Sequence, residues 1–147
     1  MGIASALVFA NLGASYGTAK AAVGISSLAV IDPGKIFQAL IPIIMAGILG
    51  IYGVIIAVIA ATKVRSDTVD EQAGYKYLGA GLSCGLSALA AGLAIGVAGD
   101  AGVRAYAQTD AIFVGMILIL IFAEAIGLYG LIVSIIMLFW AMISKRS

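Results

Sequence analysis

Residues 115–133 read GMILILIFAEAIGLYGLIV, a run of 19 residues in which Glu124 is the only charged residue. An α-helix needs roughly 20 predominantly apolar residues to cross the hydrocarbon core of a bilayer. This stretch therefore predicts a transmembrane helix, and it places one carboxyl group near the middle of that helix.

The composition of the whole chain agrees with a membrane protein. Of its 147 residues, 63% are hydrophobic and 10% are charged, and the formal net charge is +1. Soluble domains carry about a quarter charged residues, so a soluble globular fold is excluded. The near-neutral charge excludes a nucleic-acid binder. The single cysteine, Cys84, excludes a disulfide scaffold, and the absence of histidine excludes a histidine-built metal or acid–base site.

Four apolar stretches are long enough to span a membrane, and nearly all charged residues lie between them or at the ends of the chain. They cover residues 3–31, 36–62, 77–99 and 111–143. The chain is therefore predicted to be an all-α membrane protein with four transmembrane helices, forming a single transmembrane domain over residues 1–147.

Glycines are concentrated in the first and third predicted spans. Small residues spaced four apart let helix backbones approach closely inside a membrane. We therefore interpret eight of them as helix-packing positions: Gly13, Gly17, Gly24, Gly81, Gly85, Gly92, Gly96 and Gly99. The second and fourth spans are rich in large aliphatic residues and suit a lipid-facing layer. The pattern leaves open whether the glycines pack within one bundle or also between chains.

The sequence contains an internal repeat. Residues 45–53 (MAGILGIYG) align with residues 122–130 (FAEAIGLYG) at an offset of 77, with identical alanine, glycine, tyrosine and glycine positions. Because each unit holds two spans, both units enter the membrane from the same side. We therefore predict two fused helical hairpins, over about residues 3–62 and 77–143. Gly47 occupies in the first hairpin the position that Glu124 occupies in the second.

Glu124 is the only acidic residue inside any predicted span, roughly 20 Å along the helix from residue 111. A charge at that depth is costly, and intramembrane ionisable residues mark functional sites. Desolvation favours the protonated, neutral acid. Such a group can take up a proton from one side and release it in another environment. The alternative is a neutral glutamate that holds helices together through a hydrogen bond.

The residues around this acid favour a proton as the transported ion. Tyr129 follows on the same helix and is a candidate hydrogen-bond partner, while Tyr52 and Ser87 lie at a similar depth on other spans and Gly47 marks the repeat counterpart. A hard cation such as sodium needs several oxygen ligands, whereas a proton needs only the carboxylate. The sequence predicts no metal and no cofactor.

Lys20 is the other charged residue inside a predicted span. In one arrangement its long side chain reaches an interface or a water-filled space. In the other it pairs with Glu124. The second arrangement would favour the ionised carboxylate and would oppose proton loading.

Four stretches together resemble the proteolipid family of eukaryotic V-type ATPases, the c-type subunits of the membrane sector. They are GASYGTAK at residues 13–20, MAGILGIYG at 45–53, LSALAAGLAIG with GDAGVR between 86 and 104, and the run at 115–133. The resemblance implies a ring of identical or related subunits, with spans one and three inside and spans two and four outside. It implies that Glu124 is the proton carrier.

The resemblance also implies partners and a location. The stator, which is the a subunit of such complexes, would supply an arginine and two half-channels. The d subunit of the central stalk would meet the connections that follow spans one and three. The membrane would be a vacuolar or other eukaryotic endomembrane. ATP hydrolysis would occur on other subunits, and this chain has no phosphate-binding glycine-rich loop after a strand. It is not expected to be an enzyme by itself.

The sequence leaves two orientations in the membrane open. The side with both termini carries five Lys and Arg residues, and the other side carries Lys35 and Arg104. The positive-inside rule would place the termini in the cytosol, whereas the resemblance implies lumenal termini.

Two other functions remain as alternatives. One is a proton-coupled four-helix secondary transporter, in which a dimer forms a central pocket. The other is a passive structural or pore-forming protein with four spans, which would not need Glu124.

Overall fold

The computed structural model describes residues 1–66 and 71–143. Every element in these residues is helical. In chain order they are α1 (Gly2–Ile31), the short 3-10 helix η1 (Pro33–Lys35), α2 (Ile36–Ala39), α3 (Ile41–Ser66), α4 (Glu71–Tyr106) and α5 (Ile112–Ile143).

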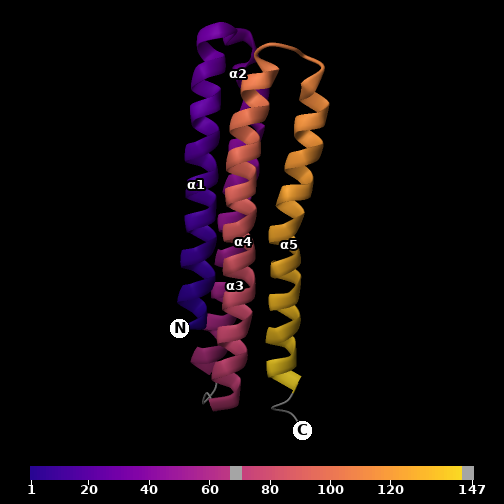
Figure 1. Cartoon of the computed structure of the whole chain (residues 1–147). Coiled ribbons are helices and arrows are strands. Elements are labelled where there is room, and N and C mark those ends of the chain that lie inside the picture. Colours follow the sequence, from indigo (N-terminus) through magenta and orange to yellow (C-terminus); the bar gives the residue numbers. More distant parts are fainter. Residues whose placement is uncertain (67–70, 144–147) are drawn as a thin grey trace.

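The four long helices of the described residues lie side by side along one axis (Figure 1). The connection from α1 to α3 and the connection from α4 to α5 lie at the same end, at the top of the view. The start of α1 and the end of α5 lie at the opposite end. Two helical hairpins therefore point the same way, which confirms the architecture expected from the internal repeat.

Two helix boundaries differ from the prediction. The span expected over residues 36–62 is broken at Leu40, so that the four-residue α2 precedes α3. Pro42 lies in the first turn of α3, where a missing backbone N–H is tolerated, and it restricts the residue before it. The third helix runs over Glu71–Tyr106 and not only over residues 77–99, because polar residues at its ends can continue a helix beyond the hydrocarbon.

By length and composition alone, three helical segments among the described residues could cross a membrane: Pro33–Val64, Glu71–Tyr106 and Ile112–Ala141. The remaining long helix, α1, is rich in Gly, Ala and Ser and packs most extensively against α4. Its 30 residues correspond to about 45 Å of helix, so it runs alongside the other three helices over the thickness of a bilayer.

Glycines set the short distance between α1 and α4. A methyl group added at Gly13 would lie 2.5 Å from the carbonyl oxygen of Ala88, and one added at Gly85 would lie 2.5 Å from the carbonyl oxygen of Ser5. At each of the eight glycines interpreted as packing positions, an added methyl group would lie within 3.1 Å of an atom of a neighbouring helix. Larger side chains would force these helices apart.

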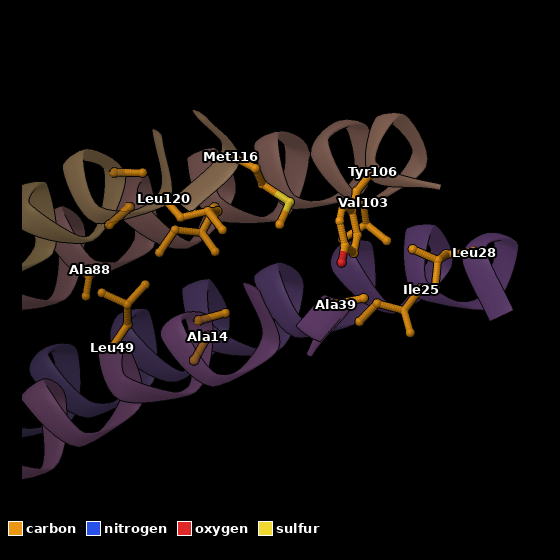
Figure 2. Close-up of a cluster of buried hydrophobic side chains, with 14 of the residues drawn as sticks. Ala14, Ile25, Leu28, Ala39, Leu49, Ala88, Val103, Tyr106, Met116 and Leu120 are labelled. Carbon is orange, nitrogen blue, oxygen red and sulfur yellow. The ribbon is translucent and has the colours of Figure 1, made fainter. Parts of the chain in front are cut away.

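The buried core between the helices is aliphatic. Figure 2 shows Val103 and Tyr106 of α4 close to Met116 of α5, with Leu28 and Ile25 of α1 at the same end of the bundle. A second buried cluster toward the other end includes Ile56, Leu131 and Leu138 from α3 and α5. The two clusters hold both hairpins in one bundle.

Polar contacts tie the two hairpin connections together. Lys35 Nζ lies 2.6 Å from Asp110 Oδ1 and 5.0 Å from the centre of the Tyr106 ring. The Tyr106 hydroxyl donates a hydrogen bond to Gln38 Oε1. The connection after α1 and the connection after α4 therefore form one joined surface at this end of the bundle.

Candidate functional site

Glu124 forms a hydrogen bond across the seam between the two hairpins. The Tyr52 hydroxyl of α3 donates to Glu124 Oε1 of α5 at 3.2 Å, and both side chains are partly buried. Tyr52 lies about 17 Å from the start of α3 and Glu124 about 18 Å from the start of α5, at 1.5 Å per residue. The pair therefore lies at one depth, well inside both spans.

Small residues bring the helices together beside this pair. A methyl group at Gly127, three residues after Glu124, would lie 2.6 Å from Leu49 Cδ2 and 3.3 Å from Ala91 Cβ. Since Gly127 has no side chain, Leu49 of α3 packs directly against the α5 backbone. This close approach holds α3 and α5 near enough for Tyr52 to reach Glu124.

The prediction that Tyr129, on the same helix, is the hydrogen-bond partner of Glu124 is wrong, because Tyr52 donates to the acid. Five residues at 100° each place Tyr129 about 140° around α5 from Glu124, and Tyr129 is exposed. From the sequence, Tyr52 shared only a similar depth with the acid. The signal that could have singled it out is the repeat, in which Tyr52 is the counterpart of Tyr129.

Ser87 and Gly47 also lie away from the carboxyl group. Ser87 donates to the carbonyl oxygen of Cys84 within α4 at 3.0 Å, and its side chain packs against Gly130. Gly47 is exposed, and a methyl group added there would meet nothing within 4 Å. The structure thus does not bring either residue to Glu124.

Lys20 pairs with an acid at the end of the bundle and not with Glu124. Its Nζ lies 3.1 Å from Asp100 Oδ2, while Arg104 Nε donates to Asp100 Oδ1 at 2.7 Å. The Asp100 side chain is 13% exposed and is shared by the two cations. Glu124 is therefore left without this cation beside it.

One polar contact was not anticipated from the sequence. The fully buried Ser134 hydroxyl of α5 donates to the carbonyl oxygen of Ala80 in α4 at 2.5 Å. It joins two helices in the same way as the Tyr52–Glu124 hydrogen bond does. A serine inside an apolar span is the signal that could have identified it.

The chemistry available at Glu124 is that of a single carboxyl group with one tyrosine donor. In the part of the chain that the structure describes, no group of three or more His, Cys, Asp and Glu residues could hold a metal ion. Hard cations take several oxygen ligands, whereas a proton needs one carboxylate oxygen. The side-chain hydrogen bond that the structure gives Glu124 comes from the Tyr52 hydroxyl.

These features define a class: multi-pass helical membrane proteins with an ionisable group inside the membrane, here on a duplicated helical hairpin. The family model for the C subunit of ATP synthase matches the chain twice, at residues 1–60 and 78–137, once for each hairpin. Curated relatives extend the comparison to nearly the whole chain.

Three of these relatives bear the name of the 16 kDa proteolipid, or c subunit, of the V-type proton ATPase. The protein of Nephrops norvegicus is 58% identical over 136 residues, which cover 92% of this chain and 86% of the relative. The Ascaris suum protein is 57% identical over 141 residues, covering 93% and 86%. The Homo sapiens protein is 55% identical over 137 residues, covering 93% and 88%.

The chain belongs to the family of 16 kDa proteolipids of the V-type proton ATPase. It is a multi-pass membrane component of the proton-translocating rotor, and the nucleotide-hydrolysing site lies in other subunits of the complex.

Proposed function

We propose that Glu124 is the residue of this rotor protein that carries the proton. It is protonated from one half-channel, moves through the lipid as the ring turns, and releases the proton beside an arginine of the stator, the a subunit of the complex. The observation that carries the proposal is the position of Glu124, the only acid within its predicted spans, at the seam of α3 and α5 with Tyr52 as donor.

The electrostatics of this cycle follow from the surroundings of the carboxyl group. In lipid, desolvation favours the neutral, protonated acid, and this form crosses the membrane at low cost. Beside a guanidinium the ionised form is favoured, and the proton leaves. Tyr52 donates to a carboxyl oxygen in both states and holds the side chain at the helix seam between these events.

The repeat also bears on the energy available to each proton. Gly47 replaces the carboxylate in the first hairpin, so each pair of hairpins carries one proton. Fewer protons then cross in one turn, and each can receive more of the energy of ATP hydrolysis. One pH unit corresponds to about 1.4 kcal/mol per proton. This stoichiometry suits the formation of steep proton gradients.

The partners follow from the same proposal. Copies of this chain, alone or mixed with related proteolipids, form the ring, and the lipid bilayer surrounds it. The joined hairpin connections face the central stalk and its d subunit, which places both termini in the lumen of a vacuolar or other endomembrane compartment. Protease cleavage of a C-terminal tag in sealed vesicles tests this orientation, because a tag cleaved from the cytosolic side would contradict it.

Substitution of the acid tests the proton-carrying role. Glu124→Gln keeps the size of the side chain and removes its titration, so ATP-driven acidification of vesicles should be lost while the ring still assembles. Glu71→Gln, which changes an exposed acid at the start of α4, is the matched control and should acidify normally. Acidification that persists in Glu124→Gln would overturn the proposal. A dimer in place of a large ring, measured by the mass of the detergent-extracted assembly, would support a secondary transporter instead.

A further inference from the structure

Two cations and one acid lie together between α1 and α4. We call Lys20, Asp100 and Arg104 the basic cluster. Asp100 Oδ2 lies 3.1 Å from Lys20 Nζ, and Asp100 Oδ1 accepts a hydrogen bond from Arg104 Nε at 2.7 Å. One carboxylate cannot balance two cations, so the basic cluster carries one positive charge in excess.

Glycines place the acid of this cluster behind the two cations. A methyl group added at Gly24 would lie 3.0 Å from Asp100 Oδ1, and one added at Gly96 would lie 3.1 Å from Lys20 Cβ. Asp100 therefore lies in the close contact between the helices, where its side chain is 13% exposed. The side chains of Lys20 and Arg104 are 40% and 48% exposed. The positive charge is therefore accessible from outside the bundle, and the negative charge is covered.

Arg104 keeps part of its hydrogen-bonding capacity. A guanidinium group has five N–H donors, and the hydrogen bond that the structure gives Arg104 uses Nε. Its two terminal nitrogens form a planar pair, an arrangement that binds two oxygens of a phosphate group at once. The Lys20 ammonium lies beside the other carboxylate oxygen of Asp100. A phosphate group can therefore supply the second negative charge that the basic cluster lacks.

An apolar surface continues from the basic cluster toward the middle of the bundle. Both α1 and α4 run toward the hairpin connections (Figure 1), so the residues one turn before the cluster lie closer to the middle. Tyr16, one turn before Lys20, is 43% exposed, and Val97, one turn before Asp100, is 55% exposed. Leu93, a further turn before Val97, is 43% exposed. This face matches an amphiphile that has a phosphate head and an acyl chain.

We propose that this face of α1 and α4 binds an anionic phospholipid, with its phosphate on Lys20 and Arg104 and an acyl chain along Val97 and Leu93. An anionic lipid balances the excess positive charge, whereas a zwitterionic headgroup brings a cation of its own. One Lys or Arg near a membrane surface favours anionic lipid about fivefold, which corresponds to about 1 kcal/mol. This site is independent of the proton-carrying role of Glu124.

Photo-cross-linking in the native membrane tests the lipid preference. The photoreactive residue p-benzoylphenylalanine replaces Val97 in one version of the full chain and Ile121 of α5 in the matched control. Ile121 is 47% exposed. It lies near the depth of Val97, because Met116 packs against Gly102 and each reporter lies five residues closer to the middle of the bundle. Lipid adducts are identified by mass spectrometry, and their anionic share should be about fivefold higher at Val97 than at Ile121.

Three substitutions separate the charge of the cluster from its packing. Arg104→Gln leaves Lys20 and Asp100 as a balanced pair, so the preference at Val97 should be lost. Asp100→Asn leaves two cations without an acid, so the preference should rise above that of the unchanged chain, whereas a loss of packing alone would lower it. Lys76→Gln removes a cation from the other end of α4 and should leave the preference unchanged.

The outcomes decide between a specific lipid site and a general attraction. A higher anionic share at Val97, lost in Arg104→Gln and raised in Asp100→Asn, supports the site. Equal shares at Val97 and Ile121 overturn it, and so does a preference that persists in Arg104→Gln or falls in Asp100→Asn. A preference that Lys76→Gln lowers as much as Arg104→Gln does also overturns it. ATP-driven acidification reports separately on proton transport, so the lipid site and the proposed function can fail independently.

Discussion

Replacing Tyr52 with phenylalanine removes the one hydroxyl that holds the Glu124 carboxyl group at the helix seam in the described structure. The rest of the bundle is unchanged, so the helices keep their places. The carboxyl group should then leave the seam more often and spend more time facing lipid. We therefore predict that a hydrophobic carbodiimide, which approaches from the bilayer, modifies Glu124 faster in Tyr52→Phe than in the unchanged chain.

The size of the effect can be worked out from the hydrogen bond. Interhelical hydrogen bonds in membrane proteins contribute about 0.6 kcal/mol on average and up to about 1.7 kcal/mol, which correspond to factors of about 3 and about 18 in population. The Tyr52–Glu124 distance of 3.2 Å is longer than the usual O–H···O distance of about 2.7–2.8 Å. The initial labelling rate should therefore rise by a factor near the lower end, about 3.

The assay is the initial rate of modification at Glu124, followed by mass spectrometry of the extracted protein. Tyr129→Phe is the matched control, because it removes the repeat counterpart of the same hydroxyl from a position that does not face Glu124. Its labelling rate should equal that of the unchanged chain. An unchanged rate in Tyr52→Phe, or an equal acceleration in both variants, would refute the role of Tyr52.

Two further predictions concern the stability of the bundle. Gly13→Ala should lower the midpoint of thermal unfolding in detergent, because its methyl group would lie 2.5 Å from a carbonyl oxygen of α4 and overpacking costs about 1–3 kcal/mol. Gly115→Ala is the control and should leave the midpoint unchanged, because its methyl group would meet open space. Equal midpoints for both variants would contradict the close packing at Gly13. Ser134→Ala should destabilise the protein by about 1 kcal/mol, measured by denaturant unfolding, because it removes the interhelical hydrogen bond to Ala80. Ser26→Ala, which removes an exposed hydrogen bond within α1, is the control. A loss of stability in Ser26→Ala as large as that in Ser134→Ala would contradict the prediction.

Hydropathy and the repeat predicted the architecture. The sequence alone shows which segments suit lipid, and it shows that the two halves of the chain are alike. Helix ends were predicted less well. Glu71, Asp100 and Arg104 lower the hydropathy of the third span, so the prediction stopped at residues 77–99, yet all three lie within α4. Hydropathy reports which residues suit lipid. It does not report where the backbone hydrogen bonds of a helix end.

The candidate site was predicted only in part, and the reason is similar. The position of Glu124 on one helix follows from the sequence, but its partner lies 72 residues away on another helix. Which side chain faces it depends on how α3 and α5 are rotated against each other. The same limit applies to Lys20, because only the close packing of α1 on α4 brings it to Asp100.

The most direct measurement of the central role of Glu124 follows two quantities in the same vesicles during carbodiimide treatment. One is the fraction of ring copies modified at Glu124, and the other is the rate of ATP-driven acidification. In the proposed ring every copy passes the stator in turn, so modification of a small fraction of the copies should abolish acidification, with Glu124 as the modified residue. Acidification that continues after every Glu124 has been modified would contradict the proton-carrying role of this residue.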